Sequence, residues 1–262
     1  MREKSDDGVM RIKLFVDSAD LGVILRHYRD PDIAGFTTNP TLMRRAGISD
    51  YAGFARAVLD AIPDRPVSFE VFADDLDGME REARIIRSWA DNTVVKIPAT
   101  NTHGVSSAPV IERLSAEGHH LNVTAILSAR RAETVIRALD PAAPAIVSVF
   151  AGRIADTGRD PEPVVRDCVA MVADRPHTEV LWASPREVLN IRHAERSGCH
   201  IITASEDLLA KRRLLGRDLD DYALETVRMF HDDASAAGYC LTGNRPLQTG
   251  TYGGDTHPSV RS

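Results

Sequence analysis

Residues 93–100 have the sequence TVVKIPAT, an apolar and β-branched run that carries one lysine, Lys96, and meets a proline near its end. Valine, isoleucine and threonine favour strands, and proline ends a strand because it has no N–H to donate to the ladder. The stretch therefore predicts a buried strand with a cationic side chain inside it. Buried lysines are rare unless they are paired or functional, so Lys96 needs a chemical explanation.

Other short apolar runs resemble this one, and stretches with helical periodicity separate most of them. Such alternation is typical of a parallel α/β fold. The expected strands cover residues 13–17, 33–38, 67–72, 93–98, 121–126, 145–150, 179–184 and 200–205. The expected helices cover residues 48–62, 74–90, 107–118, 128–140, 160–174 and 184–198, with a last helix after Leu219. This number of units in 262 residues predicts a single (β/α)₈ barrel, a fold that takes about 250 residues.

An open, doubly wound sheet is the alternative fold. It normally carries a glycine-rich phosphate loop, and neither G-x-G-x-x-G nor a Walker A pattern occurs in the sequence. We expect an N-terminal extension over residues 1–11, the barrel with a C-terminal helix over 12–238, and a flexible tail over 239–262. The polar segment 101–109 follows the fourth strand, and we expect it to form a rim or lid.

The composition narrows the classes of function. A formal net charge of -6 argues against a general nucleic-acid binder, although a few local arginines suffice for small anionic substrates. No window reaches the roughly 18 to 20 apolar residues of a membrane span, and residues 1–20 lack the apolar core of a signal peptide. We therefore expect a cytoplasmic protein without membrane contact. The spacing of cysteines and histidines predicts neither disulfides nor a metal site.

Polar residues occupy the C-terminal ends of several expected strands, where barrel enzymes place their chemistry. Lys96 is the clearest case, because desolvation favours a neutral amine that can attack a carbonyl; a structural ion pair fits the pattern equally well. Glu70 and Asp17 interrupt their own strands and can transfer protons near such an amine, or serve as structural partners. The further polar residues at these ends are Asn39, Asn122, Thr124, Ser148, Arg153, Ser184 and Arg186.

Two of these residues are arginines that follow the sixth and seventh strands. Arg153 and Arg186, together with Ser184, can form a phosphate clamp, since guanidinium groups match phosphate oxygens with paired hydrogen bonds. The alternative is that both are solvated loop arginines. The pattern alone leaves this choice open.

In chain order, these residues lie in stretches that resemble the transaldolase family, specifically its short bacterial branch, which includes fructose-6-phosphate aldolase. The resemblance runs from residue 12 to about residue 235, and the matching stretches are VDSAD (16–20), GFTTNPTL (35–42), SFEV (68–71), VVKIPAT (94–100), NVTAILS (122–128), SVFAGRIADTG (148–158) and WASPRE (182–187). Each stretch is modest alone, but the ordered set is specific. The resemblance implies a barrel of the class I aldolase type, which uses no metal or cofactor, and a homo-oligomer.

The resemblance also implies roles for individual residues. Lys96 is implied to form a Schiff base with the substrate ketone, and Asp17 to accept the proton of the C4 hydroxyl during cleavage. Glu70 and Thr124 are implied to handle the catalytic water. The residues implied to bind the dihydroxyacetone moiety are Asn39, Asn122 and Ser148, and those implied to bind phosphate are Arg153, Ser184 and Arg186.

The implied activity is the transfer of a dihydroxyacetone unit from a ketose phosphate, such as fructose 6-phosphate or sedoheptulose 7-phosphate, to an aldose phosphate. Glu70 and Phe150 stand where fructose-6-phosphate aldolases have Gln and Tyr, and phenylalanine offers no hydroxyl to protonate the enamine, so transfer is favoured over release. A dihydroxyacetone-releasing aldolase is the nearest alternative. An inactive sugar-phosphate-binding barrel is the alternative from another class.

Three features of the sequence depart from the short branch. They are the extra polar residues around 101–109, leucine at position 127 and the long tail from about residue 240. These departures leave the acceptor aldehyde open. The pentose phosphate pathway and specialised sugar biosynthesis are both compatible with the motifs.

Overall fold

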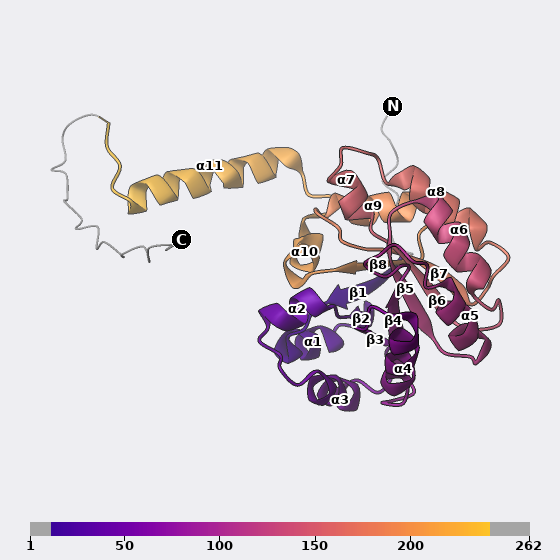
Figure 1. Ribbon diagram of the computed structural model, residues 1–262. Helices are drawn as coiled ribbons and strands as arrows, with labels where there is room; N and C mark the ends of the chain where they lie inside the picture. Colours follow the sequence, from indigo (N-terminus) through magenta and orange to yellow (C-terminus); the bar gives the residue numbers. More distant parts are fainter. Residues whose placement is uncertain (1–11, 242–262) are drawn as a thin grey trace, which may run out of the picture. The chain divides into compact units, whose positions relative to one another are not determined.

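The computed structural model describes residues 12–241, and the chain divides into two compact units, one up to Arg213 and one from Leu214. In the first unit, parallel strands close into a barrel in the order β1 to β8 (Figure 1). The strands are β1 (Lys13–Asp17), β2 (Ile33–Thr37), β3 (Val67–Glu70), β4 (Thr93–Pro98), β5 (Leu121–Ile126), β6 (Ala145–Val149), β7 (Thr178–Trp182) and β8 (Ile201–Ala204). The (β/α)₈ barrel predicted from the sequence is confirmed.

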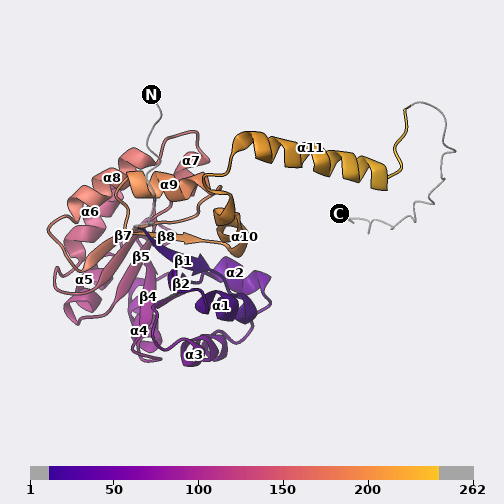
Figure 2. The same ribbon diagram turned by 180° about the vertical axis from the view of Figure 1, so that it is seen from behind.

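Helices lie outside the strands of the first unit in both views (Figures 1 and 2). They are α1 (Leu21–Tyr28), α2 (Pro40–Arg45), α3 (Tyr51–Ala61), α4 (Leu76–Arg87), α5 (Ala108–Ala116), α6 (Ala129–Ala138), α7 (Ala151–Ala155), α8 (Glu162–Met171), α9 (Leu189–Arg196) and α10 (Glu206–Ala210). A 3₁₀ turn, η1, follows at Lys211–Leu214. No helix within residues 12–241 combines the length and the apolar character needed to cross a membrane.

The second unit contains one long helix, α11 (Leu219–Ala236), as the sequence predicts. Its N-terminus is capped by Asp218, whose carboxylate accepts hydrogen bonds from the backbone N–H groups of Asp220 and Asp221. The expected N-terminal extension and all but the first three residues of the expected tail lie outside the described residues.

Several predicted boundaries were wrong by a few residues. The seventh strand was expected to run to Ser184, and a helix to begin there, but β7 ends at Trp182 and α9 begins at Leu189. Ser184 has a φ of 61°, a left-handed conformation that continues neither a strand nor a helix. Helices α1, α2, α7 and α10 were not predicted, because five to eight residues are too few to establish a helical period.

Two apolar clusters hold the barrel together. The larger one lies between the strands and the surrounding helices. The smaller one fills the barrel interior and consists of Phe15, Val94, Ile146, Leu181, Ala183 and Ile201. Because side chains alternate along a strand, the residues two positions beyond Phe15 and Val94, namely Asp17 and Lys96, also face inward. This interior cluster, called the apolar floor below, thus lies directly beneath the polar side chains at the C-terminal end of the barrel.

Gly35 on β2 makes room for the largest side chain of this floor. A Cβ atom built at Gly35 would lie 2.6 to 2.8 Å from three atoms of the Phe15 ring, closer than nonbonded carbons approach. Phe15 and Gly35 are also paired in the register of β1 and β2. Glycine is therefore required here by close packing and not by backbone conformation.

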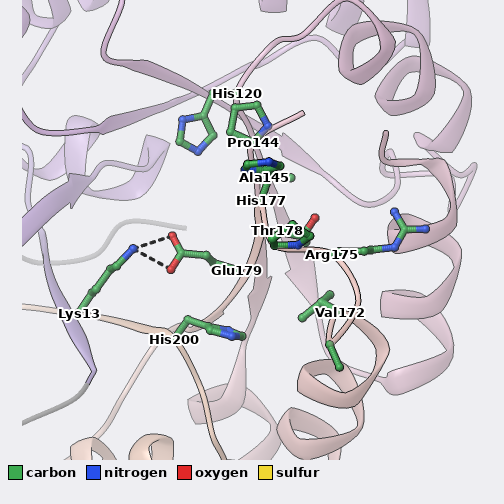
Figure 3. A pocket seen from close by; sticks show the side chains of 12 residues that line it. Lys13, His120, Pro144, Ala145, Val172, Arg175, His177, Thr178, Glu179 and His200 are labelled. Carbon is green, nitrogen blue, oxygen red and sulfur yellow. Dashed lines mark hydrogen bonds and ion pairs between the residues drawn. The ribbon is translucent and has the colours of Figure 1, made fainter. Parts of the chain in front are cut away.

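A cavity of about 420 Å³ opens at the N-terminal end of the barrel (Figure 3). Asp17 and Lys96 lie near the opposite, C-terminal ends of their strands. The walls of the cavity include the first residues of β1, β6 and β7 and the residues just before β5 and β8. Lys13 and Glu179 form an ion pair there with Nζ and Oε1 2.8 Å apart. His120 lines the same cavity, and burial lowers its pKa to about 4, against a smaller opposing effect of Glu179.

We expect Gly35→Ala to lower the free energy of unfolding by about 1 to 3 kcal/mol, because the added methyl group clashes with the Phe15 ring. Urea unfolding measures the change. In a Phe15→Leu background, the same substitution should cost clearly less. An equal cost in both backgrounds would show that the ring is not what excludes a side chain.

Acid should destabilise the fold through His120. Its folded pKa of about 4 lies below the unfolded value of about 6.5, so the unfolded chain binds more protons between these values and stability falls as pH drops through this window. We expect the loss in the free energy of unfolding on acidification to be smaller in His120→Gln than in wild type, by up to about 3 kcal/mol. Unfolding curves at pH 7 and pH 4.5 measure it, and His103→Gln, on an exposed loop, is the control. Equal pH dependence in wild type and His120→Gln would contradict the assignment.

Candidate active site

The register of three adjacent strands brings the central residues side by side. Lys96 on β4 is paired with Glu70 on β3 and with Asn122 on β5. Glu70 and Lys96 lie toward the C-terminal ends of their strands. Asn122 lies earlier in β5 and faces the barrel interior beside Lys96. Parallel pairing therefore converts three separate motifs of the sequence into one row of polar groups.

Lys96 is buried, with 6% of the residue exposed, and its amine has two partners. Nζ lies 2.9 Å from Oε2 of Glu70 and donates a hydrogen bond of 2.9 Å to the backbone carbonyl of Thr38. A buried ammonium group without such partners would be costly. Glu70 is thus placed both to stabilise the charged amine and to take a proton from it.

Asp17 lies at the end of β1. It accepts hydrogen bonds from Thr37, the last residue of β2, and from Asn39, which follows β2. Its Oδ1 accepts a hydrogen bond of 2.8 Å from the Thr37 hydroxyl, and its Oδ2 accepts one of 3.3 Å from Nδ2 of Asn39. Burial raises the pKa of Asp17; Lys96 and the two hydrogen bonds oppose this effect, and Glu70 adds to it. A carboxyl group in this environment can both accept and return a proton.

Asn39 has its amide orientation fixed by a second role as the N-cap of α2. Its Oδ1 accepts a hydrogen bond of 3.0 Å from the backbone N–H of Leu42. This contact assigns the oxygen to the helix and turns the Nδ2 donor toward Asp17. The proline at the next position, Pro40, suits the first turn of a helix, so the local sequence builds this arrangement.

The interior wall formed by β3, β5 and β6 carries a second polar chain. The Ser148 hydroxyl donates to Oδ1 of Asn122 over 2.6 Å, and Nδ2 of Asn122 donates to the Ser68 hydroxyl over 3.0 Å. Thr124, two residues further along β5, is 1% exposed, and its hydroxyl has no hydrogen-bond partner among the described residues. An unpaired buried hydroxyl beside this chain is suited to a water molecule or a substrate oxygen.

The candidate phosphate residues lie on two segments, one after β6 and one after β7, and these segments are in close contact. A Cβ atom at Gly152 would be 1.5 Å from the carbonyl oxygen of Ser184 and 3.3 Å from Nε of Arg186. Only glycine permits this close approach of α7 to the segment after β7. The guanidinium of Arg153 lies 5.0 Å from the centre of the Phe150 ring.

Arg186 is paired with Asp156 instead of standing free for a ligand. Its Nε donates to Oδ1 of Asp156 over 3.0 Å, and both side chains are about half exposed. Within residues 12–241, no hydrogen bond or ion pair joins either candidate arginine to the cluster of Lys96, Glu70 and Asp17. The predicted residues thus fall into a buried polar cluster around Lys96 and a more exposed group after β6 and β7, called the basic rim below.

Hydrogen bonds hold the polar segment after β4 in a defined turn. The side chain of Asn101 accepts hydrogen bonds from the backbone N–H groups of His103 and Val105, and Thr100 is bridged to Ser106. Thr102 ties this turn to Asp74, which lies after β3, through a hydroxyl hydrogen bond of 2.6 Å. These contacts fasten the turn to the segment after β3, and the expectation that residues 101–109 form a rim or a lid stays a prediction.

Several residues that hold the buried polar cluster in place were not predicted from the sequence. Tyr51 on α3 accepts a hydrogen bond of 2.8 Å from the backbone N–H of Glu70 and is surrounded by aromatic rings, including Phe69 and Trp89. Thr37 and Thr203 form a hydroxyl pair 2.6 Å apart. Thr37 lies in the stretch GFTTNPTL, in which only Asn39 was predicted to be a site residue. Nothing in the sequence around Tyr51 or Thr203 indicates the site.

Comparison with known proteins supports the family that the motifs indicate. A family model described as Transaldolase/Fructose-6-phosphate aldolase matches residues 14–239. A probable transaldolase of Dehalococcoides mccartyi is 35% identical over 199 residues, which cover 76% of this chain and 88% of that protein. A probable transaldolase of Thermoanaerobacter sp. is 32% identical over 228 residues, which cover 87% of this chain and 99% of that protein.

A solved structure supports the fold. The crystal structure of KGPDC from Streptococcus mutans aligns with a TM-score of 0.51 at 12% identity, covering 75% of this chain and 88% of that one. This likeness bears on the barrel alone. The family match covers most of the chain and contains the whole buried cluster, from Asp17 to Thr124, as well as the basic rim. The protein belongs to the transaldolase/fructose-6-phosphate aldolase family.

Proposed function

We propose that this enzyme is a transaldolase that moves a dihydroxyacetone unit from a ketose phosphate to an aldose phosphate through a Schiff base on Lys96. The observation that carries the proposal is the buried amine of Lys96, 2.9 Å from the Glu70 carboxylate, in a cluster that also contains Asp17. A buried amine beside proton-accepting groups is what imine formation with a ketone requires.

The first step joins enzyme and substrate. Lys96 gives up a proton to Glu70, and the neutral amine attacks the C2 carbonyl of the ketose phosphate to form a carbinolamine. Loss of the C2 oxygen as water, protonated through Glu70, leaves the iminium ion. The unpartnered hydroxyl of Thr124 is available to hold this water.

The second step breaks the bond between C3 and C4. Asp17 accepts the proton of the C4 hydroxyl, C4 becomes an aldehyde carbon, and the bonding electrons move toward the iminium nitrogen to form an enamine. The aldose phosphate then leaves. Because the raised pKa of Asp17 makes its protonated form accessible, Asp17 can return the proton when the enamine attacks a new aldehyde.

The remaining site residues bind the two ends of the substrate. Asn39 and the pair of Asn122 and Ser148 offer hydrogen bonds to the hydroxyl groups of the dihydroxyacetone moiety. Arg153, Ser184 and Arg186 bind the phosphate at the rim. A phosphate there competes with Asp156 for Arg186, and exchange of one anion for another costs little at a half-exposed position.

Phe150 favours transfer over release of free dihydroxyacetone. It follows β6 and packs against the interior apolar cluster, two residues beyond Ser148. Its ring presents no hydroxyl group that can protonate the enamine, so the intermediate persists until an aldehyde arrives. The acceptors to test are aldose phosphates of three to five carbons.

Replacing the proposed nucleophile should abolish transfer. We expect Lys96→Met to lower the rate of transfer from fructose 6-phosphate to an aldose phosphate by more than about 10³-fold. Lys13→Met is the matched control, since Lys13 also pairs with a glutamate but at the opposite end of the barrel, and it should keep the wild-type rate. A folded Lys96→Met enzyme with substantial activity would rule out the proposal.

Phe150→Tyr should shift the balance from transfer to release, because the new hydroxyl can protonate the enamine. We expect the ratio of released dihydroxyacetone to transferred product to rise about tenfold. The assay measures dihydroxyacetone with and without an acceptor. Phe72→Tyr is the control, because the Phe72 ring lies after β3 and is half exposed. If wild type already releases dihydroxyacetone as fast without an acceptor as it transfers with one, the protein is a releasing aldolase.

A further inference from the structure

We propose that Thr203 on β8 is a positioning residue for the acid–base chemistry of Asp17, acting through the hydroxyl of Thr37. This inference rests on the proposed function, in which Asp17 accepts a proton during cleavage and returns it during addition. Thr203 itself has no contact with Asp17 among the described hydrogen bonds, so its effect must pass through Thr37.

The three residues form a continuous chain inside the barrel. The Thr203 and Thr37 hydroxyl oxygens are 2.6 Å apart, and the Thr37 oxygen is 2.8 Å from Oδ1 of Asp17. Strands β8 and β2 both pair with β1, so their inward side chains can meet across the strand that carries Asp17. Thr37 and Thr203 are 3% and 6% exposed, so bulk water does not replace these contacts readily.

The direction of the hydrogen bonds in this chain depends on the charge of Asp17. A hydroxyl group has one proton to donate. When Asp17 is ionised, Thr37 must donate to it, and Thr203 then donates to Thr37. When Asp17 carries a proton on Oδ1, it donates to Thr37, and Thr37 donates to Thr203. The chain can reverse by rotation of two hydroxyl groups, without movement of any heavier atom.

Removal of the Thr203 hydroxyl affects the two charge states unequally. With Asp17 ionised, Thr37 keeps its bond to the carboxylate and loses only a donor to its own oxygen. With Asp17 protonated on Oδ1, the Thr37 proton is left buried without an acceptor, which is the more costly defect. Thr203 therefore helps Asp17 to hold a proton. This effect adds to burial, which raises the pKa of Asp17, and opposes the direct hydrogen bond from Thr37, which lowers it.

Other charges near Asp17 stay in place in such a variant. The charged groups that act on Asp17 are Lys96 on β4 and Glu70 on β3, and its further hydrogen-bond partner is Asn39. Among the described residues, none of the three forms a hydrogen bond or an ion pair with Thr203. A shift in the titration of Asp17 on changing Thr203 is thus attributable to the hydroxyl chain.

The test compares Thr203→Val with Thr203→Ser. We expect Thr203→Val to lower kcat for transfer about tenfold, and to move the acid limb of the kcat/KM profile against pH about half a unit to one unit lower. Thr203→Ser keeps the hydroxyl and should stay close to wild type in both respects. Thr178→Val, which removes another buried threonine hydroxyl at the far end of the barrel, is the control and should leave the profile unchanged.

Trapping with borohydride separates this inference from the proposed function. Wild type and Thr203→Val should form the reduced adduct with fructose 6-phosphate to the same extent, because imine formation precedes the step of Asp17. No adduct in wild type would overturn the proposed function itself. A normal adduct with an unmoved pH profile, or one moved to higher pH, would overturn the role of Thr203. If Thr203→Val does not fold, Thr203→Ala gives the same comparison.

Discussion

The contact between the Lys96 ammonium and the Glu70 carboxylate is the interaction on which the site depends. Two charges withdrawn from water are costly, and their attraction repays this cost only when further hydrogen bonds complete the geometry. The backbone carbonyl of Thr38 supplies one of these bonds, and Tyr51 fixes the backbone that carries Glu70. The charged pair is therefore stable inside the apolar barrel. It can still exchange a proton, because Nζ of Lys96 is the proton donor and Oε2 of Glu70 is the acceptor.

The barrel contains a second lysine–glutamate pair that shows what burial adds. Lys13 and Glu179 are 2.8 Å apart at the N-terminal end, where their side chains are 53% and 30% exposed, whereas those of Lys96 and Glu70 are 8% and 16% exposed. A solvated pair contributes little energy and needs no further partners. The N-terminal end of a barrel serves stability and the C-terminal end serves chemistry, so the same two residue types have different consequences at the two ends.

The sequence alone located the barrel strands, though not all of their ends, and the polar residues of the buried cluster. The run 93–98 is β-branched and ends at proline, so its inward lysine stands out, as does the glutamate in the apolar run 67–72. Hydrogen-bond partners were not predictable in the same way. Thr203 sits in an ordinary strand, and its meeting with Thr37 depends on barrel closure between β8 and β1. The pairing of Arg186 with Asp156 likewise depends on two loops whose conformations leave no periodic signal.

We propose that Lys96 forms a covalent bond with the C2 carbon of a ketose phosphate. The most direct measurement is borohydride reduction of the enzyme in the presence of fructose 6-phosphate, followed by proteolysis and mass spectrometry of the peptides. We expect one added mass, located on Lys96 and absent without substrate. Modification of a different lysine, or no substrate-dependent modification under conditions of turnover, would contradict it.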